Sequence, residues 1–228
     1  MRTRIPHLFG RWALIAASIA ALLFLSAGTA RIASIRNYLV ASSVVLLATM
    51  LAVDPGLAQE RTKPKHAGAD ESRVAAGLLF VLTLAVAGFS VGHCRQAFNT
   101  PPPTRHLALG VFLLSGAFQA WAMIANPFFS PVVRIQTERR HHLIAKGPYR
   151  LIRHPGYFAM CIAVPTSALS IGSWLALAPA AGFVAVIFRR AQVEDEFLGR
   201  NLHGYRKYAA LIPSGLPWTT ATRAGTNL

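Results

Sequence analysis

Long apolar runs are the feature that most limits what this chain can fold into. Four of them, at about residues 12–29, 38–53, 74–91 and 107–124, come close to the ~17 to 25 residues that a helix needs to cross a bilayer. Hydrophobic residues make up 54% of the 228-residue chain and charged residues only 14%, which is far from the balance of an ordinary soluble domain. Spans of this length form helices, because each backbone polar group in lipid needs a partner within its own segment. We therefore predict an all-α integral membrane protein.

The first apolar run also has features of a secretory signal peptide. Arg2 and Arg4 precede it, and Ser26–Ala30 resembles a cleavage site. The run is nevertheless longer than the usual apolar core of such a peptide, which is roughly 7 to 15 residues. We expect a helix that is retained in the mature protein.

A fifth apolar region, from Tyr157 to Phe188, is about 32 residues long and would measure ~48 Å as one straight helix. The hydrocarbon core is only ~30 Å thick, so we do not expect a single span. Small and helix-breaking residues at Ser170–Ser173 favour a hairpin of two antiparallel half-helices of about fifteen residues each. The chain would then have about five transmembrane segments, the last a long helical hairpin that brings Arg153–His154 and Arg190–Glu194 to the same membrane face.

The basic residues predict how the chain is oriented. The formal net charge is +15, but no basic run is interleaved with aromatic residues outside the loops, so we expect no nucleic acid partner. With the hairpin in place, nineteen of the 23 Lys and Arg residues fall on one side of the membrane, and Lys and Arg collect in cytoplasmic loops. We expect a multi-pass protein of the inner or plasma membrane whose N-terminus and polar cluster are cytoplasmic. The four on the other side are Arg31, Arg36, Arg95 and Arg105.

The polar residues at the ends of the hairpin predict a cytoplasmic pocket. The side chains expected to meet there are His141, His142, Tyr149, Arg153, His154, Tyr157, Arg190, Glu194, Tyr205 and Tyr208. Aromatic faces can stack on a nucleobase or lie against a sulfonium, and a carboxylate can hold an amine or ribose hydroxyls. Adjacent histidines lack the i, i+4 spacing of helical metal ligands, so we predict no metal site. Plainer interpretations are open as well: Arg153 and Arg190 as interfacial cations, and Glu194–Glu196 as a solvated helix face.

The order of these motifs resembles a known family. From Gln136 onward the chain is similar to the isoprenylcysteine carboxyl methyltransferase family, whose members are membrane-embedded and use S-adenosylmethionine, and more distantly to the phospholipid N-methyltransferases. The motifs that carry the resemblance are His141–Ile144, Gly147–Tyr149, Arg153–Tyr157, Arg190 with Glu194, Asp195 and Leu198, and Gly204–Tyr208 leading to Ile212–Pro217. Asp195 stands where many relatives have a second glutamate. Asp54–Pro55 and Arg61 are reminiscent of a loop in bacterial members.

The resemblance implies two parts in the chain and a role for each site residue. Residues 1–130 would hold about four spans, and residues 131–228 would form the methyltransferase-like region with its cofactor-binding loop, hairpin and tail. The residues implied to bind S-adenosylmethionine are Gln136, His141, His142, Leu143, Ile144, Tyr149, His154, Pro155, Gly156, Tyr157 and Glu194. Arg190, on the same helical face as Glu194, would position the substrate carboxylate. The resemblance thus implies carboxyl O-methylation of an isoprenylcysteine-like or other lipophilic carboxylate that enters from the lipid bilayer.

Two other functions are compatible with the sequence. A phospholipid or other lipid-amine N-methyltransferase would keep the cofactor pocket but would have to deprotonate the acceptor amine. A non-catalytic membrane protein would use the polar cluster only to bind a ligand or to stabilise the hairpin. A nicotinamide-dependent reductase is less favoured, because the chain shows no glycine fingerprint for a dinucleotide.

Overall fold

The structure, a computed structural model, describes residues 4–53, 57, 71–94 and 99–216, and within 4–7 only the backbone. Apart from a single bridge between Asn99 and Ser173, these residues contain no β-structure, which confirms the all-α prediction. The expected polar loop after residue 53, with Asp54–Pro55 and Arg61, lies almost entirely outside the described residues. The helices are α1 Arg4–Ala27, α2 Ala33–Ala52, α4 Glu71–His93, α5 Pro102–Ala125, α6 Pro155–Ile171, α7 Leu177–Asn201 and α8 Tyr205–Leu211, with 3-10 turns η2 Thr137–Arg139 and η3 Gly147–Arg150.

Among the residues that the structure describes, four helices are long and apolar enough to cross a membrane. They are α1 from Leu8 onward, α2, α4 and α5. Their outer faces carry large apolar side chains with no protein cover, such as Leu25 at 81% exposed and Leu114 at 72% exposed. Surfaces of this kind are stable against lipid rather than water. The protein is therefore a multi-pass integral membrane protein, as predicted.

The predicted hairpin is present as α6 and α7. It turns at Gly172, whose φ of +121° is a conformation that side chains with a Cβ rarely adopt, and Arg105 and Val91 lie beside the space that a Cβ would fill. α6 has 17 residues, close to the expected length. α7 has 25 residues, so the prediction of about fifteen was wrong for this arm. The helix continues past Phe188 because the polar residues that follow, rich in Arg, Gln and Glu, are good helix formers.

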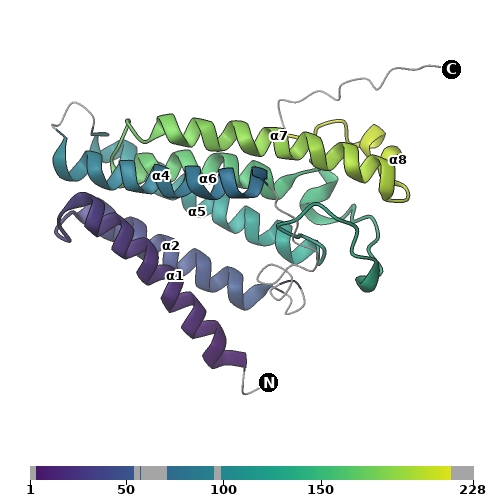
Figure 1. Ribbon diagram of the computed structural model, residues 1–228, viewed down its shortest axis with the longest axis horizontal. Helices are drawn as coiled ribbons and strands as arrows, with labels where there is room; N and C mark the ends of the chain where they lie inside the picture. The colour runs from purple at the N-terminus through teal and green to yellow at the C-terminus, as the bar shows by residue number, and fades with distance from the viewer. Residues whose placement is uncertain (1–3, 54–56, 58–70, 95–98, 217–228) are drawn as a thin grey trace.

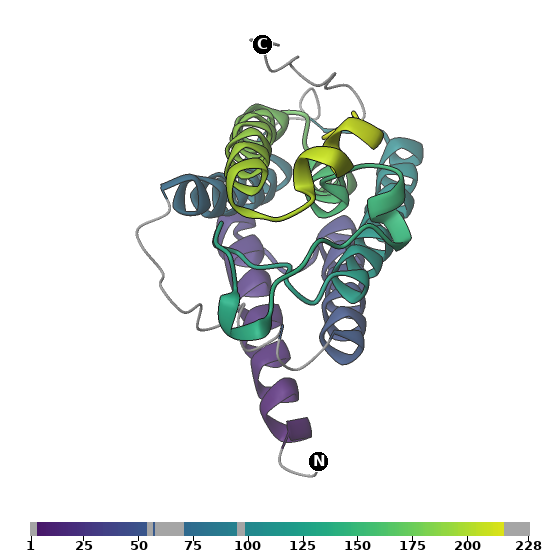
Figure 2. The ribbon, with the colours of Figure 1, turned by 90° about the vertical axis from the view of Figure 1, so that its right-hand side faces the viewer.

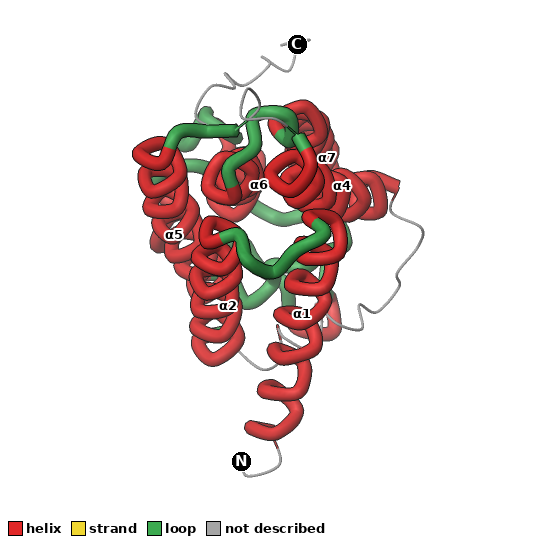
Figure 3. The backbone as a smooth tube through the Cα atoms, turned by 90° about the vertical axis from the view of Figure 1, so that its left-hand side faces the viewer, coloured by secondary structure: helices red, strands yellow, loops and turns green. Residues whose placement is uncertain are grey.

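The helices pack in two layers. Figures 1 and 3 show α4, α6 and α7 together with α5 beside α6, and α1 and α2 beneath them. One apolar core joins the layers, with Leu23 of α1, Tyr38 of α2, Leu84 of α4, Phe112 of α5 and Ala168 of α6 among its buried members. Helices from both sides of residue 130 therefore share this core, and the division of the chain at that residue stays a prediction.

Two glycines on α4 allow α1 to approach closely. A methyl group at Gly92 would overlap the carbonyl group of Ala27, and one at Gly88 would overlap the side chain of Ser26. Close backbone approach through small residues is typical of helix pairs in membranes, where dispersion contacts replace the hydrophobic effect between helices. The contact fixes α1 against α4 near the end of the bundle opposite the polar cluster.

Chain segments that are distant in sequence meet at the other end of the bundle. Figure 2 looks onto this end and shows the long connection between α5 and α6 crossing in front of the helices, with α8 beside the start of α6. The connection, residues 126–154, contains both 3-10 turns. The hairpin returns α7 to the same end, so the motifs singled out from the sequence are collected here.

Candidate functional site

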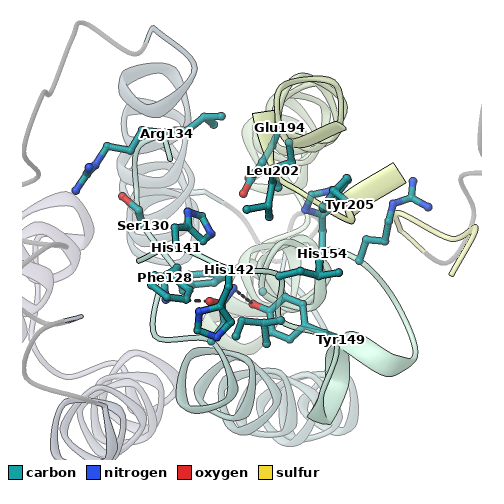
Figure 4. Close-up of a pocket in the computed structure, with 18 of the residues that line it drawn as sticks. Phe128, Ser130, Arg134, His141, His142, Tyr149, His154, Glu194, Leu202 and Tyr205 are labelled. Carbon is teal, nitrogen blue, oxygen red and sulfur yellow. Dashed lines mark hydrogen bonds between the residues drawn. The ribbon is translucent and has the colours of Figure 1, made fainter. Parts of the chain in front are cut away.

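A cavity opens at this end of the bundle. It holds about 770 Å³ of space between its lining atoms, open solvent at the mouth included. The end of α5, the connection to α6, the first turn of α6, the polar half of α7 and the segment through α8 all contribute to its wall. Figure 4 shows Phe128 and His142 on one side and Glu194 and Leu202 on the other.

The structure brings most of the predicted cofactor residues to the lining of this cavity. Those that line it are His141, His142, Leu143, Ile144, Tyr149, His154, Gly156, Tyr157 and Glu194. They come from three separate stretches of sequence, which the hairpin and the α5–α6 connection place side by side. Their convergence is an observation of the structure, whereas their role in binding S-adenosylmethionine stays a prediction.

Gln136 and Pro155 are buried and do not line the cavity. The Gln136 Nε2 donates to the Phe128 carbonyl at 2.8 Å, and its Oε1 accepts from Nη1 of Arg139 at 2.9 Å. Pro155 occupies the first position of α6, where a residue without an N–H is well tolerated. Gln136 therefore shapes the loop behind Phe128, and Pro155 starts the helix that carries Tyr157.

Arg190 lies directly behind the cavity wall. Its side chain is 5% exposed and donates from Nε to the Tyr157 hydroxyl at 2.8 Å, from Nη1 to the Ser72 hydroxyl at 2.9 Å, and from Nη2 to the Pro131 carbonyl. The Tyr157 hydroxyl in turn donates to Oε2 of Glu194 at 2.6 Å. One hydroxyl group therefore connects the guanidinium to the carboxylate at the cavity, although Arg190 itself is not among the lining residues.

Phe128 and Asn126 were not predicted as site residues. The Phe128 ring stacks on His141 with centroids 4.4 Å apart, and the Asn126 amide donates to the Tyr149 hydroxyl at 3.2 Å. Both lie before residue 131, where the sequence shows only the end of an apolar run at Asn126–Pro127. The end of that apolar run could have indicated Asn126, since a polar residue at this position lies at the same end of the bundle as the motifs.

Asp195 is the most connected carboxylate of the site, yet it does not line the cavity. It accepts from His154 Nε2 at 2.9 Å, from Arg153 Nη2 at 2.7 Å and from the Tyr205 hydroxyl at 2.5 Å. Its place beside Glu194 in the motif was visible in the sequence, but the direction of its side chain was not. Neighbouring residues on a helix point about 100° apart, so Glu194 and Asp195 serve different partners.

Burial and charge set the protonation states around the cavity. Burial, followed by the nearby cations, lowers the pKa of His141 to about 4, so this ring is neutral at pH 7 and stacks on Phe128 without charge. Burial also raises the pKa of Tyr149, which keeps its hydroxyl protonated.

Asp195 lies beyond the apolar part of α7. Burial alone would raise its pKa, but hydrogen bonds from His154 and Arg153 hold this pKa well below its usual range.

The lining suits a cofactor that combines a nucleobase, a sulfonium and an amino acid. Aromatic faces of Phe128, His141 and Tyr149 can meet the base or the sulfonium, and Glu194 can accept from an amine or ribose hydroxyl. Arg134 brings a cation to the same wall, although it is also bonded to Glu138. Within the described residues, no three His, Cys, Asp or Glu side chains are grouped as metal ligands.

Part of the chain is similar to known proteins of one family. The model of the isoprenylcysteine carboxyl methyltransferase family matches residues 108–200, from α5 through α7. A probable protein-S-isoprenylcysteine O-methyltransferase of Oryza sativa subsp. japonica is 39% identical over 101 residues, which are 41% of this chain and 50% of the relative. Protein-S-isoprenylcysteine O-methyltransferase B of Arabidopsis thaliana is 29% identical over 125 residues, 50% of this chain and 59% of the relative.

The chain spans about half the length of the curated relatives that it matches. No solved structure matches it significantly. The resemblance predicted from Gln136 onward is confirmed as far as residue 200, and the match begins earlier, within α5. For the motifs after residue 200 it stays a prediction. Residues 108–200 are therefore similar to the isoprenylcysteine carboxyl methyltransferase family.

Proposed function

We propose that this protein is an S-adenosylmethionine-dependent methyltransferase that methylates the carboxylate of an isoprenylcysteine-like or other lipophilic acceptor. The observation that carries the proposal is the bonded series from Arg190 through the Tyr157 hydroxyl to Glu194 at the cavity wall. It places a cation suited to a carboxylate next to a carboxylate suited to the cofactor. The family of the matched segment supports the same activity.

This methyl transfer requires the protein to position the cofactor and the acceptor, and it does not require a general base. The cofactor supplies an electrophilic methyl group on a sulfonium, and the acceptor carboxylate is already ionised near neutral pH because carboxyl groups have a pKa of about 4. The protein therefore has to align the two partners and remove water between them. Glu194 would hold the polar end of the cofactor, and the aromatic lining would shield the sulfonium from water.

Arg190 would orient the acceptor by two parallel hydrogen bonds. In the structure its donors reach Tyr157, Ser72 and Pro131, so an incoming carboxylate would have to replace at least one of these neutral acceptors. Exchange of the carbonyl or hydroxyl partner for a carboxylate is favourable in a site with little water, because a charge-assisted bond is roughly twice as strong as a neutral one. This role makes Arg190 a candidate catalytic residue without any proton transfer.

The membrane position fits a lipophilic acceptor. We place the cavity and the N-terminus on the cytoplasmic side, because nineteen of the 23 Lys and Arg residues fall on that side in this topology. The cofactor would then enter from the cytoplasm, and the apolar part of the acceptor would stay between helices and lipid. The Arg190 side chain bonds to Ser72 at the start of α4 and to Pro131 in the α5–α6 connection, so an acceptor that reaches Arg190 would lie near these two segments.

The test begins with binding of S-adenosylmethionine to the detergent-solubilised protein, measured by calorimetry. Glu194→Gln should weaken binding about 10-fold or more, because it removes a charge that accepts hydrogen bonds. Glu196→Gln is the matched control, since Glu196 is exposed and only loosely paired with Arg200 at 3.8 Å. The absence of saturable binding to the folded wild-type protein would remove the basis of the proposal.

The acceptor is tested with a radiolabelled methyl donor. An N-acetyl-S-prenylcysteine should be methylated, and Arg190→Lys should raise KM for it far more than KM for the cofactor, because lysine cannot make the paired bonds. Methylation of an aminophospholipid instead, unaffected by Arg190→Lys, would replace carboxyl transfer by N-methylation.

A further inference from the structure

The Asp195 carboxylate bonds to residues from two other parts of the chain, at the start of α6 and the start of α8. On Oδ1 it accepts from His154 Nε2 at 2.9 Å, Arg153 Nε at 3.1 Å and the Tyr205 hydroxyl at 2.5 Å, and on Oδ2 from Arg153 Nη2 at 2.7 Å. His154 precedes α6, Tyr205 begins α8, and Asp195 itself lies on α7. The arginine and histidine side chains are only 7% and 5% exposed, so these bonds are sheltered from water.

Arg153 extends this connection to the end of the described chain, which we call the C-terminal strap (residues 205–216). Its Nη1 donates to the carbonyls of Ile212 at 2.6 Å and Pro213 at 2.7 Å. The backbone N–H groups of Arg153 and His154 donate to the carbonyls of Ser214 and Gly215, each at 3.1 Å. Both side-chain and backbone bonds therefore attach the strap to the start of α6. Asp195 orients the Arg153 side chain, which makes the side-chain bonds.

The C-terminal strap forms part of the cavity wall. Tyr205 and Tyr208 both line the cavity, and the Tyr208 hydroxyl donates to the Tyr149 carbonyl at 2.6 Å. Figure 4 shows Tyr205 close to His154 at the edge of the cavity. The position of two lining tyrosines therefore depends on a carboxylate that is outside the lining.

The same carboxylate also fixes the His154 ring. An ionised carboxylate can only accept hydrogen bonds, so the ring carries a proton on Nε2, which points at Asp195. A partner of this kind sets both the tautomer and the orientation of a histidine. His154 lines the cavity and stacks on Tyr157 with ring centroids 5.5 Å apart, so its orientation affects the cavity surface.

We propose that Asp195 is a positioning residue of the cofactor cavity, which holds the His154 ring and the C-terminal strap in place without touching the cofactor. The inference rests on the proposed function, because it takes the cavity to be the S-adenosylmethionine site. It assigns the second acidic residue of the Glu194–Asp195 pair a task distinct from that of the first. Glu194 would contact the cofactor, and Asp195 would order the wall around it.

The central experiment compares Asp195→Asn, Asp195→Glu and the control Glu196→Gln. Asparagine keeps the shape of the Asp195 side chain, but it removes the charge and turns an N–H₂ group toward the hydrogen-bond donors around it. The Kd for S-adenosylmethionine should therefore rise about 10- to 100-fold, as expected when bonds to a charged group are lost. KM for the acceptor and kcat with saturating cofactor should change little. Glutamate keeps the charge and should restore part of the affinity, and Glu196→Gln should match the wild type.

A second measurement separates positioning from general stability. Hydrogen exchange of the C-terminal strap should become faster in Asp195→Asn, while exchange in α4 and α5 should stay unchanged. Faster exchange with an unchanged Kd for the cofactor would overturn the inference, because the carboxylate would then be structural only. Where Asp195→Asn does not fold, Tyr205→Phe removes one bond and keeps the ring, and an unchanged Kd in that variant overturns the inference equally.

Failure of the proposed function has a different signature. If the wild-type protein folds but binds no S-adenosylmethionine, the cavity is not the cofactor site and the positioning role is overturned together with it. If the wild type binds and Asp195→Asn binds equally well, only the role of Asp195 is wrong. When the wild type binds, weaker binding by Glu194→Gln supports this cavity as the cofactor site whatever the result for Asp195→Asn, because Glu194 lines the cavity.

Discussion

The two ends of the helical bundle are held together in different ways. In α1 and α2, hydroxyls such as those of Ser18, Ser42 and Thr49 bond to carbonyls of their own helix, and close packing at Gly88 and Gly92 brings α1 against α4. The polar bonds to other segments there come from neutral groups, such as the bond from the Ser34 hydroxyl to the Ile171 carbonyl. At the cavity end, charged side chains bond across the sequence, from Arg153 to Asp195 and from Arg190 to Ser72. The first region is therefore held mainly by packing and neutral bonds, and the second by individual charged pairs.

This difference has a consequence for mutations. In the lipid-facing region, the free energy of folding depends mainly on the volume of side chains at close contacts, so most polar-to-apolar changes on the outer face should be tolerated. At the cavity end, removal of one atom leaves a buried donor or acceptor without its partner, and that penalty is larger than the bond itself. The predictions below test this contrast, beginning with the largest expected effect.

Arg153→Ala should be the most damaging single change. It removes the partner of a partly buried carboxylate and the two side-chain bonds to the C-terminal strap, and breaking such a pair typically costs about 3–5 kcal/mol of folding free energy. We expect the lower end of that range, because Asp195 is 26% exposed. Thermal unfolding in detergent measures the effect, with exposed Arg150→Ala as the control. An equal Tm for both variants would contradict the dependence on polar pairs.

Gly92→Ala should have the next largest effect on stability but none on cofactor affinity. The added methyl group meets the carbonyl of Ala27 and must push α1 away from α4, at a cost of about 1–3 kcal/mol. Gly77 on the same helix has open space around it, so Gly77→Ala should be neutral or stabilising by up to about 1 kcal/mol. Unfolding and cofactor binding are measured on both variants. A loss of binding in Gly92→Ala would show that the two regions are coupled.

The same contrast explains what the sequence could predict. The spans and the hairpin follow from the length of apolar runs against the thickness of a bilayer, and Gly172 is found at the turn because the break was sought near the middle of a run that was too long. The length of α7 could not be read in this way, since the bilayer sets a limit only for apolar residues. Helix propensity beyond Phe188 decided it.

The sequence could predict which residues lie at the site, but it could not predict in which direction their side chains point. Glu194, Asp195 and Glu196 are consecutive acids, and on α7 they face the cavity, the Arg153–Tyr205 cluster and the exterior respectively. The sequence cannot distinguish these directions until the elements around the helix are placed. Gln136 illustrates the same difficulty, because its amide turns to the Phe128 carbonyl rather than to the cavity.

Tyr157→Phe should affect function more than stability. The ring and its packing against Cys161 and Ile187 remain, while the hydroxyl between Arg190 and Glu194 is lost. Because both bonds involve a charged group, we expect kcat/KM for the acceptor to fall about 10-fold or more. Tyr38→Phe in α2 is the matched control, because Tyr38 is buried in the apolar core and does not line the cavity, and it should leave kcat/KM unchanged. Equal activity of Tyr157→Phe and the wild type would mean that Arg190 and Glu194 act independently.

The smallest expected effect is a pH dependence that comes from His141. Burial and nearby cations lower its pKa to about 4 in the folded protein, against about 6.5 in an unfolded chain. The unfolded state therefore binds a proton first as the pH falls, so the contribution of His141 to stability is full above pH 6.5 and decreases between pH 6.5 and pH 4. Protonation would also place a charge in the stack with Phe128. His141→Asn should therefore reduce the drop in Tm between pH 7.5 and pH 5, whereas exposed His203→Asn should leave that drop as it is in the wild type. An identical drop in all three proteins would show that this histidine is not neutral when folded, and the stacked wall of the cavity would then need a different electrostatic description.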